Sequence, residues 1–408
     1  MNLPSPNTPP VPLQQGNSPL SAPQPLASID SYPLSFTATG SEYFRIWIVN
    51  LLLIVVTLGI YLPWAKVRKL KYFYGNTRID DDALDFHGEP KKMLRGTAIV
   101  GVFFLVYSQA MRIAPMAGAV ALVALLALWP LLFRAAMRFR LANTSWRGMR
   151  FRFADAGLLE PYFCLVPPIA LLLIPGVLMG FSAESAGAKQ AMGTAAAATF
   201  GFAVLVFACL MPYFFWRTKR YQHNHYAWGS LQSEYRSGAW NTYKVFGLTA
   251  LVVLLLSTLM GIAIAVMVPA LFMGGIKGGG RGMFWTLLSL LPLFFIFLVS
   301  VNIAPRAFFV ARMQNLLWSR TGSHHFRFKS DLSARKFMGL QFKNYLLIMV
   351  TLGLYWPFAV VATKRMQIEA VQLRSRIDLN TLTDAARKRE NDATGDMAAD
   401  VFGLDVGM

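Results

Sequence analysis

Charge is scarce in this chain. Only 14% of its 408 residues are Asp, Glu, Lys or Arg and 55% are hydrophobic, whereas a soluble protein of this length needs far more charge to cover its surface. The apolar residues form eight blocks, and most of these reach the ~20 residues that cross a ~30 Å hydrocarbon layer as a helix. Because backbone polar groups cannot stay unpaired in lipid, the composition predicts an all-α polytopic membrane protein. The blocks are 44–63, 94–111, 117–133, 162–181, 194–216, 245–272, 284–304 and 340–361.

Chemically reactive groups are equally scarce. The only two cysteines, Cys164 and Cys209, lie inside apolar blocks, which argues against a disulfide framework or a thiol metal site. The blocks contain no Asp or Glu, although intramembrane carboxylates usually mark proton relays in pumps. His223 and His225 have the spacing of two metal ligands on a strand, but a third ligand is missing. A phosphate-binding glycine loop and a nucleophile elbow are also missing, so we predict no metal, no cofactor and no enzymatic activity.

The two ends lack the marks of folded or targeting segments. Residues 1–35 contain nine prolines and no Lys or Arg, so they have neither the basic start nor the apolar core of a signal peptide. We predict a disordered tail over 1–35, an integral membrane domain over 36–383 and a polar tail over 384–408.

Internal repetition is the most informative feature that is present. The segment 50–63 (NLLLIVVTLGIYLP) recurs at 344–357 (NYLLIMVTLGLYWP) with ten of fourteen positions identical and no gap. Five apolar blocks have a proline near their ends, and similar residues recur at similar distances after each of these prolines. Further along the chain, in most of the copies, apolar residues alternate with polar ones, as is typical of a strand. We predict units of membrane helix, basic amphipathic helix and short β-hairpin, with shorter end copies at 36–86 and 328–378. The prolines are Pro63, Pro130, Pro212, Pro305 and Pro357.

The positive charge is distributed unevenly between the loops. The formal net charge is +19, and Lys and Arg are concentrated in the loops 64–96, 134–161, 217–244 and 305–338. The positive-inside rule places these loops in the cytoplasm and explains the charge without nucleic acid. A basic residue stands eight positions after four of the five prolines, and we predict contacts from these residues to anionic lipid headgroups. They are Lys71, Arg138, Arg220 and Arg365.

The two end blocks allow two interpretations. Each has about the 20 apolar residues of one ordinary membrane crossing, which would put both termini outside. Alternatively, each block is a re-entrant or interfacial hairpin that turns at its Thr-Leu-Gly sequence, where Gly permits the turn and Thr satisfies freed backbone groups. The candidate functional or packing residues are Asn50, Thr57 and Gly59 and their counterparts Asn344, Thr351 and Gly353.

The N-terminal stretch resembles a known family. The residues that carry the resemblance are Phe36-x-x-x-Gly40-Ser-Glu-Tyr-Phe44, then Asn50, then Thr57-Leu-Gly-Ile-Tyr-Leu-Pro63-Trp-Ala-Lys-Val-Arg68, then Tyr72-Phe-Tyr74-x-Asn76-Thr77. With the ending Asp400-Val-Phe-Gly-Leu-Asp405-Val-Gly407, they resemble the YjgN-type family of bacterial inner-membrane proteins over roughly residues 34–380. That family has no known function. The resemblance therefore implies a multi-pass location in the bacterial inner membrane and brings no substrate or catalytic residue.

Two functions remain open from the sequence. Internal repeats with Gly- and Pro-interrupted segments at corresponding positions are typical of many transporters, which favours a transporter- or channel-like protein for an unknown solute. The alternative is a non-transporting scaffold that binds anionic lipid or a partner protein. A polar path joining Asn50, Asn344, Asn302 and Gln109 would favour transport, whereas dry packing of these residues above a basic cytoplasmic face would favour the scaffold.

Overall fold

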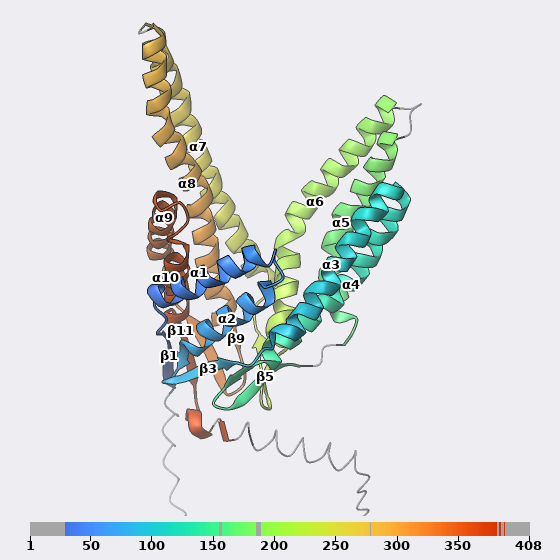
Figure 1. The fold of residues 1–408 in the computed structure, drawn as a ribbon, viewed down its shortest axis with the longest axis vertical. Coiled ribbons are helices and arrows are strands. Elements are labelled where there is room, and N and C mark those ends of the chain that lie inside the picture. Colours follow the sequence, from blue (N-terminus) through green and yellow to red (C-terminus); the bar gives the residue numbers. More distant parts are fainter. Residues whose placement is uncertain are drawn as a thin grey trace, which may run out of the picture.

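The molecule consists of a barrel-like sheet with helical hairpins rising from one side of it (Figure 1). The computed structural model describes residues 29–154, 157–184, 189–277, 279–381, 383–384 and 387. Most of the two predicted tails therefore lies outside the described residues. Residues 30–35, at the end of the predicted N-terminal tail, belong to the first strand.

The helices, in chain order, are α1 (Gly40–Val56), α2 (Leu62–Gly75), α3 (Pro90–Ile113), α4 (Pro115–Ala142), α5 (Glu160–Glu184), α6 (Lys189–Asn224), α7 (Ala239–Lys277), α8 (Gly279–Ser319), α9 (Ala334–Val350) and α10 (Trp356–Glu369). The strands are β1 (Asp30–Phe36), β2 (Thr77–Ile79), β3 (Asp82–Phe86), β4 (Thr144–Trp146), β5 (Met149–Phe153), β6 (Tyr226–Trp228), β7 (Leu231–Gln232), β8 (Glu234–Tyr235), β9 (Thr321–Gly322), β10 (Phe326–Ser330) and β11 (Val371–Ser375).

These elements group into five units with the same order, strand–helix–helix–strand. The units are β1-α1-α2-β2, β3-α3-α4-β4, β5-α5-α6-β6, β7/β8-α7-α8-β9 and β10-α9-α10-β11. Each of the five prolines noted in the sequence lies in the second helix of its unit. The repeat in the sequence thus corresponds to a repeat in the fold.

The strands form one sheet in the order β7-β6-β5-β4-β3-β2-β1-β11-β10-β9-β8. Each unit pairs its own first and last strands, as where Leu34 lies opposite Ile79. Two-residue turns join the first four units to one another, and residues 323–325 join the fourth to the fifth. Pairing of β11 with β1 joins the last unit to the first, with Leu373 opposite Tyr32. Because only Ser233 separates β7 from β8, the two ends of the strand order meet and the sheet returns on itself as a barrel.

The predicted short hairpins are present, as in β2–β3 and β4–β5, but the all-α fold class was wrong because the hairpins join in one eleven-stranded sheet. An isolated two-stranded hairpin is marginal in water, and its edges stay unpaired. Here β1, β3 and β5 each pair with their own unit over one half and with a neighbouring unit over the other, as β3 does with β4 and β2. The hairpins are stable because the ring supplies a partner on both sides.

Side chains fill the barrel. The rings of Trp146 and Trp228 lie 4.9 Å apart, and Leu379, which follows β11, is only 1% exposed. A small barrel packed in this way has a solid interior and no channel. The interior is made by Ile79, Trp146, Met149, Trp228, Leu231, Leu373 and Leu379, with Tyr32, Leu34, Leu84, Phe151, Phe326 and Phe328 against them.

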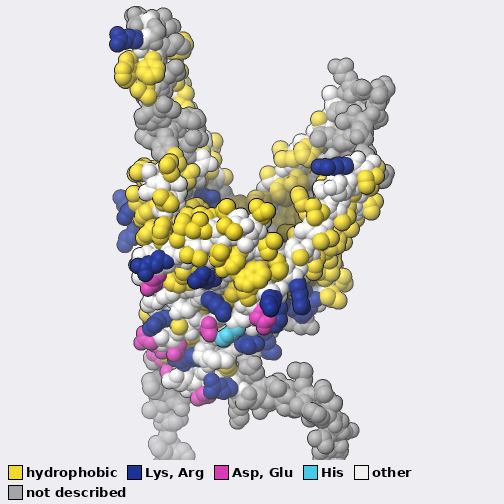
Figure 2. Space-filling view, in the orientation of Figure 1, with side chains coloured by type: hydrophobic (Ala, Val, Ile, Leu, Met, Phe, Trp, Pro, Cys, Tyr) yellow, Lys and Arg dark blue, Asp and Glu magenta, His cyan; other side chains and the backbone are white. Residues whose placement is uncertain are grey.

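Around the barrel the helices form a funnel that widens away from the sheet (Figure 1). Neighbouring units pack through α2 and α3, α4 and α5, α6 and α7, α8 and α9, and α10 and α1. The second helices also contact one another, as Phe133 of α4 does Tyr221 of α6 and Phe215 of α6 does Phe309 of α8. Figure 2 shows apolar side chains along the arms and in the hollow between them, with Lys and Arg gathered near the barrel.

The funnel wall has two heights. The helices of the end units have 17 and 14 residues each, whereas those of the middle units have 24 to 41. Because α10 packs on α1, the two short hairpins are neighbours and make one low side.

Eight apolar spanning helices are not present among the described residues. Four helices there are long and apolar enough to cross a membrane, over Pro90–Ala110, Ala117–Ala142, Thr194–Asn224 and Ala239–Ala265. The end blocks 44–63 and 340–361 are each divided between two short helices. The protein is thus mostly helical, as the sequence predicted, but four of its described helices, and not eight, are long and apolar enough to span a membrane.

Candidate functional site

The two end hairpins turn at the Thr-Leu-Gly sequences and have the same hydrogen bonds. Thr57 Oγ1 donates to the Leu53 carbonyl (2.7 Å) and accepts from the Tyr61 amide (3.0 Å). Thr351 Oγ1 does the same with Leu347 (2.6 Å) and Tyr355 (3.0 Å). The amides of Gly59 and Gly353 reach back to carbonyls five residues earlier, at 2.8 and 2.7 Å. The turns therefore satisfy much of their own backbone, as a turn in an apolar medium requires.

The tips of these hairpins are apolar and exposed. Leu58 and Leu352 are 93% and 94% exposed, and Val56 and Val350 beside them are 78% and 73% exposed. Both leucines have positive φ, 49° and 50°, in a region where glycine or asparagine is the usual residue. A leucine held there costs about 1–2 kcal/mol. Such a cost at both tips indicates that an apolar side chain is needed at that point.

Each end hairpin leaves the barrel and returns to it. β1 precedes α1–α2 and pairs with β2, which follows them; β10 and β11 flank α9–α10 in the same way. Both ends of the hairpin thus lie on the barrel side. This geometry favours the re-entrant interpretation of the end blocks over two ordinary crossings.

Asn50 and Asn344 are buried, but they do not pair with each other. Asn344 Nδ2 donates within its own hairpin, to the Ala359 carbonyl (3.3 Å) and Thr363 Oγ1 (3.2 Å), and Gln341 also bonds Thr363 (3.2 Å). The side-chain oxygens of both residues, Asn50 Oδ1 and Asn344 Oδ1, are buried and have no hydrogen-bond partner among the described residues. Gln109 and Asn302 are exposed on α3 and α8. Asn50, Asn344 and Gln109 share no hydrogen bond with one another in the part of the chain that the structure describes.

The four predicted basic residues occupy equivalent places in α2, α4, α6 and α10, near the barrel. Lys71, Arg138 and Arg220 are exposed, and Arg220 stacks 5.3 Å from the Trp216 ring. Arg365 is also exposed, but its guanidinium donates to the Ala38 carbonyl of the first unit at 2.7 Å. Arg365 therefore helps to join the last unit to the first.

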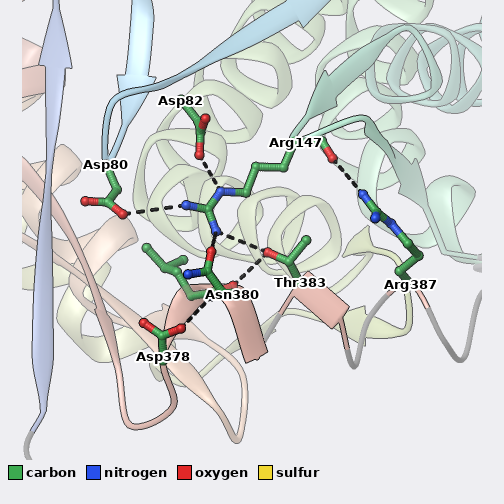
Figure 3. A network of polar contacts seen from close by, with 8 residues as sticks. Asp80, Asp82, Arg147, Asp378, Asn380, Thr383 and Arg387 are labelled. Atoms are coloured by element: carbon green, nitrogen blue, oxygen red, sulfur yellow. Dashed lines mark hydrogen bonds and ion pairs between the residues drawn. The ribbon is translucent and has the colours of Figure 1, made fainter.

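Arg147 holds together three segments at the far mouth of the barrel, and sequence reasoning missed it (Figure 3). It lies in the β4–β5 turn and pairs with Asp80 (3.6 Å) and Asp82 of the β2–β3 hairpin. It also donates to Asn380 (3.0 Å) and Thr383 (3.4 Å), which follow the last strand. Asp80 to Asp82 and Arg147 are turn residues in the sequence, and nothing there relates them to a segment more than 200 residues away.

Few other side-chain clusters in the described part of the chain suggest catalysis or metal binding. His223 is buried and contacts Thr321 Oγ1 at 2.9 Å, whereas His225 Nε2 lies 3.3 Å from Glu160. Among the described residues, no group of three or more His, Cys, Asp or Glu side chains is placed to hold a metal.

Residues 31–401 match a family model described as a bacterial protein of unknown function, DUF898. Inner membrane protein YjgN of Escherichia coli O157:H7 is 35% identical over 130 residues, which are 31% of this chain and 32% of that protein. The proteins of the same name from Escherichia coli K12 and Salmonella typhimurium are 34% and 26% identical, over 32% and 36% of their lengths. The matched part is thus about a third of these relatives. No solved structure matches.

Proposed function

We propose, from the premise that this chain belongs to the DUF898 family, that it is a non-conducting scaffold that binds anionic lipid at the cytoplasmic face of the membrane. The family match confirms the resemblance seen in the sequence. The chain is a multi-pass protein of the bacterial inner membrane, as its apolar helices and the names of its relatives indicate.

The filled barrel is the observation that carries the proposal. Trp146, Trp228 and Leu379 occupy the axis below the funnel, and Arg147 fixes the segment that contains Leu379. A solute that entered the funnel would meet packed apolar side chains there. The exposed Lys71 and Arg220, in contrast, lie on α2 and α6 near the ends that lead into the barrel, and anionic headgroups are attracted to a membrane-facing basic residue by about 1 kcal/mol.

Transport of a solute is the other candidate function. The funnel supplies an opening on one side, but transport also needs a polar path that continues through the axis or between the helices. Asn50 and Asn344, which the sequence offered for that path, are buried in the short hairpins, and Asn344 donates to the Ala359 carbonyl of its own hairpin. The scaffold therefore has the stronger support.

The lipid that surrounds the protein tests the proposal. We would extract the protein with its native lipid into polymer-bounded discs and measure the phosphatidylglycerol fraction relative to the whole membrane. The variant Lys71→Gln/Arg220→Gln should lose most of the enrichment. The control Arg150→Gln/Arg152→Gln removes equal charge from exposed positions on β5 and should keep it. No enrichment in the wild type, or equal loss in both variants, would contradict lipid binding by the helices.

A further inference from the structure

The barrel wall is interrupted in the fourth unit. In each of the first three units the first and last strands pair over three residues, whereas β8 and β9 pair over two. The missing third pair would join Ser233 to Ser323. The amide of Ser233 donates instead to the Tyr226 carbonyl at 2.8 Å, and that of Ser323 to the Phe326 carbonyl at 2.7 Å. Interruptions of a ladder, such as bulges, are common beside functional sites.

A pocket of about 460 Å³ opens where this pair is missing. Ser233 and Ser323 line it and are 7% and 8% exposed. The Ser233 hydroxyl donates to the His223 carbonyl, whereas the Ser323 hydroxyl has no hydrogen bond within the described part of the chain. Gln232 and Glu234 also line the pocket and alternate with buried residues, so they stand on the outer face of the barrel. The pocket therefore opens outward and leaves one buried polar group for a ligand to satisfy.

His225, on the wall of this pocket, stands where the first two units have asparagine. Asn76 and Asn143 each donate a side-chain N–H to the carbonyl four residues earlier, at 2.8 and 2.7 Å, and so cap the second helix of the unit. His225 Nδ1 makes the same contact with the Tyr221 carbonyl at 2.7 Å. Because a carbonyl oxygen can only accept, Nδ1 carries a hydrogen. The histidine thus keeps the cap and adds a second nitrogen, Nε2, which presents a lone pair in the neutral ring.

The groups that face the pocket are mainly hydrogen-bond acceptors. Nε2 of His225 lies 3.3 Å from Glu160 Oε2, and a lone pair and a carboxylate need a donor between them. Glu234 uses Oε2 to accept from Arg236 at 2.8 Å, and its Oε1 has no partner in the described structure. Although the chain carries a net charge of +19, no Lys or Arg among the described residues lines this pocket. The pocket thus offers a cation two carboxylates and a lone pair.

We propose that this pocket binds a small organic ammonium ion. One ammonium group lies between His225 Nε2 and Glu160, where it supplies the missing N–H donors and a charge that the carboxylate balances. In a short diamine the second ammonium group lies beside Glu234. An organic cation suits the pocket better than a metal ion, since no three metal-ligating side chains are grouped among the described residues. The site lies on the barrel and does not depend on the binding of lipid by the helices.

Thermal unfolding of the full-length protein in neutral detergent, followed by tryptophan fluorescence, tests the site. A ligand that binds only the folded state raises the midpoint, and we expect a rise of several degrees with putrescine, a short diamine. Butanediol, a neutral molecule of the same length, and sodium chloride at equal chloride concentration should give no such rise. Butylamine, with a single ammonium group, should give a smaller one.

Substitutions assign the two ammonium positions. Glu160→Gln and His225→Asn should each remove most of the rise with putrescine, and His225→Asn should still fold because asparagine makes the same cap in the first two units. Glu234→Gln should reduce the rise to that of butylamine. The matched control is Glu89→Gln, which removes the same charge from an exposed residue that likewise precedes a proline at the start of a unit's first helix, and it should keep the full rise.

Four outcomes would overturn the proposal. Putrescine may not shift the wild type at all, as expected if a protonated His225 pairs directly with Glu160 and leaves no place for a ligand. Butanediol or sodium chloride could match putrescine, which would show that no ammonium group is recognised. His225→Asn could keep the full rise, so that Nε2 has no part in binding. Glu89→Gln could lose as much as Glu160→Gln, which would reduce the effect to general charge.

Discussion

At the residue scale, the leucines at the hairpin tips combine an unfavourable backbone with nearly complete exposure. Asparagine adopts positive φ more readily than leucine, so Leu58→Asn and Leu352→Asn should preserve the turns. They remove an apolar side chain whose burial in lipid contributes about 1.5–3 kcal/mol. We expect the double variant to unfold normally in detergent but to hold its tips less deeply in a bilayer.

A spin label at Ile60, which is 65% exposed beside the first turn, would report this depth in a background without Cys164 and Cys209. In the parent protein the label should be accessible to oxygen and shielded from a water-soluble nickel complex. The Asn variant should reverse that preference. A label that is accessible to nickel in the parent would mean that the tip never enters the bilayer.

The two buried asparagines should differ in their contribution to stability. Asn344→Leu removes two hydrogen bonds to α10, which together contribute on the order of 1 kcal/mol. Asn50→Leu removes no hydrogen bond that the described structure shows, and both variants remove a buried side-chain oxygen that has no partner there, so that contribution is common to the two. We therefore expect Asn344→Leu to reduce the free energy of unfolding by about 1 kcal/mol more than Asn50→Leu, as measured by chemical denaturation in detergent. Equal losses would indicate an equivalent role for the two symmetry-related residues.

At the scale of elements, the Gly353 turn decides whether α9 and α10 form a hairpin or one helix. Its φ is +94° and an added Cβ would meet no atom within 4 Å, so the cost of Gly353→Ala is purely conformational, about 1–2 kcal/mol. Gly339→Ala, inside α9 and equally open, is the matched control and should stabilise by about 0.5–1 kcal/mol. Thermal midpoints that move in opposite directions would fit this prediction. If both variants are stabilised, the turn does not hold the backbone described here.

The sequence predicted where helices, turns and strands lie better than it predicted which of these elements pair with one another. The Thr-Leu-Gly turns were one of two interpretations of the end blocks, suggested by the backbone roles of Gly and Thr, and alternating apolar residues located β3, β5 and β10. The fourth unit departs from the common spacing, because its last strand begins two residues later after the proline than the last strands of the other units do. The strand begins at Thr321, because α8 is longer after Pro305 than the other second helices are after their prolines. Proline spacing therefore gives the period of the repeat and does not determine the register of each strand.

At the scale of the whole molecule, the ring could not be inferred because its decisive contacts join the two ends of the chain. Tyr32 lies opposite Leu373, and Arg365 donates to Ala38, 327 residues away. Local periodicity contains no information about which strand edges meet.

Ring closure makes a sharp prediction about topology. Ser31 lies in β1, Asp81 in the β2–β3 turn and Arg376 just after β11; because these strands share one sheet, a bilayer cannot separate them. Arg281, near the start of α8, lies at the far end of the tallest hairpin (Figure 1). Single cysteines at these four exposed positions, without Cys164 and Cys209, would be treated with an impermeant thiol reagent. The positive-inside rule predicts labelling of Arg281→Cys in intact cells and of the other three only after lysis. Labelling of Ser31→Cys and Arg376→Cys with protection of Asp81→Cys would mean that the end blocks cross the membrane and that β1 does not join the barrel.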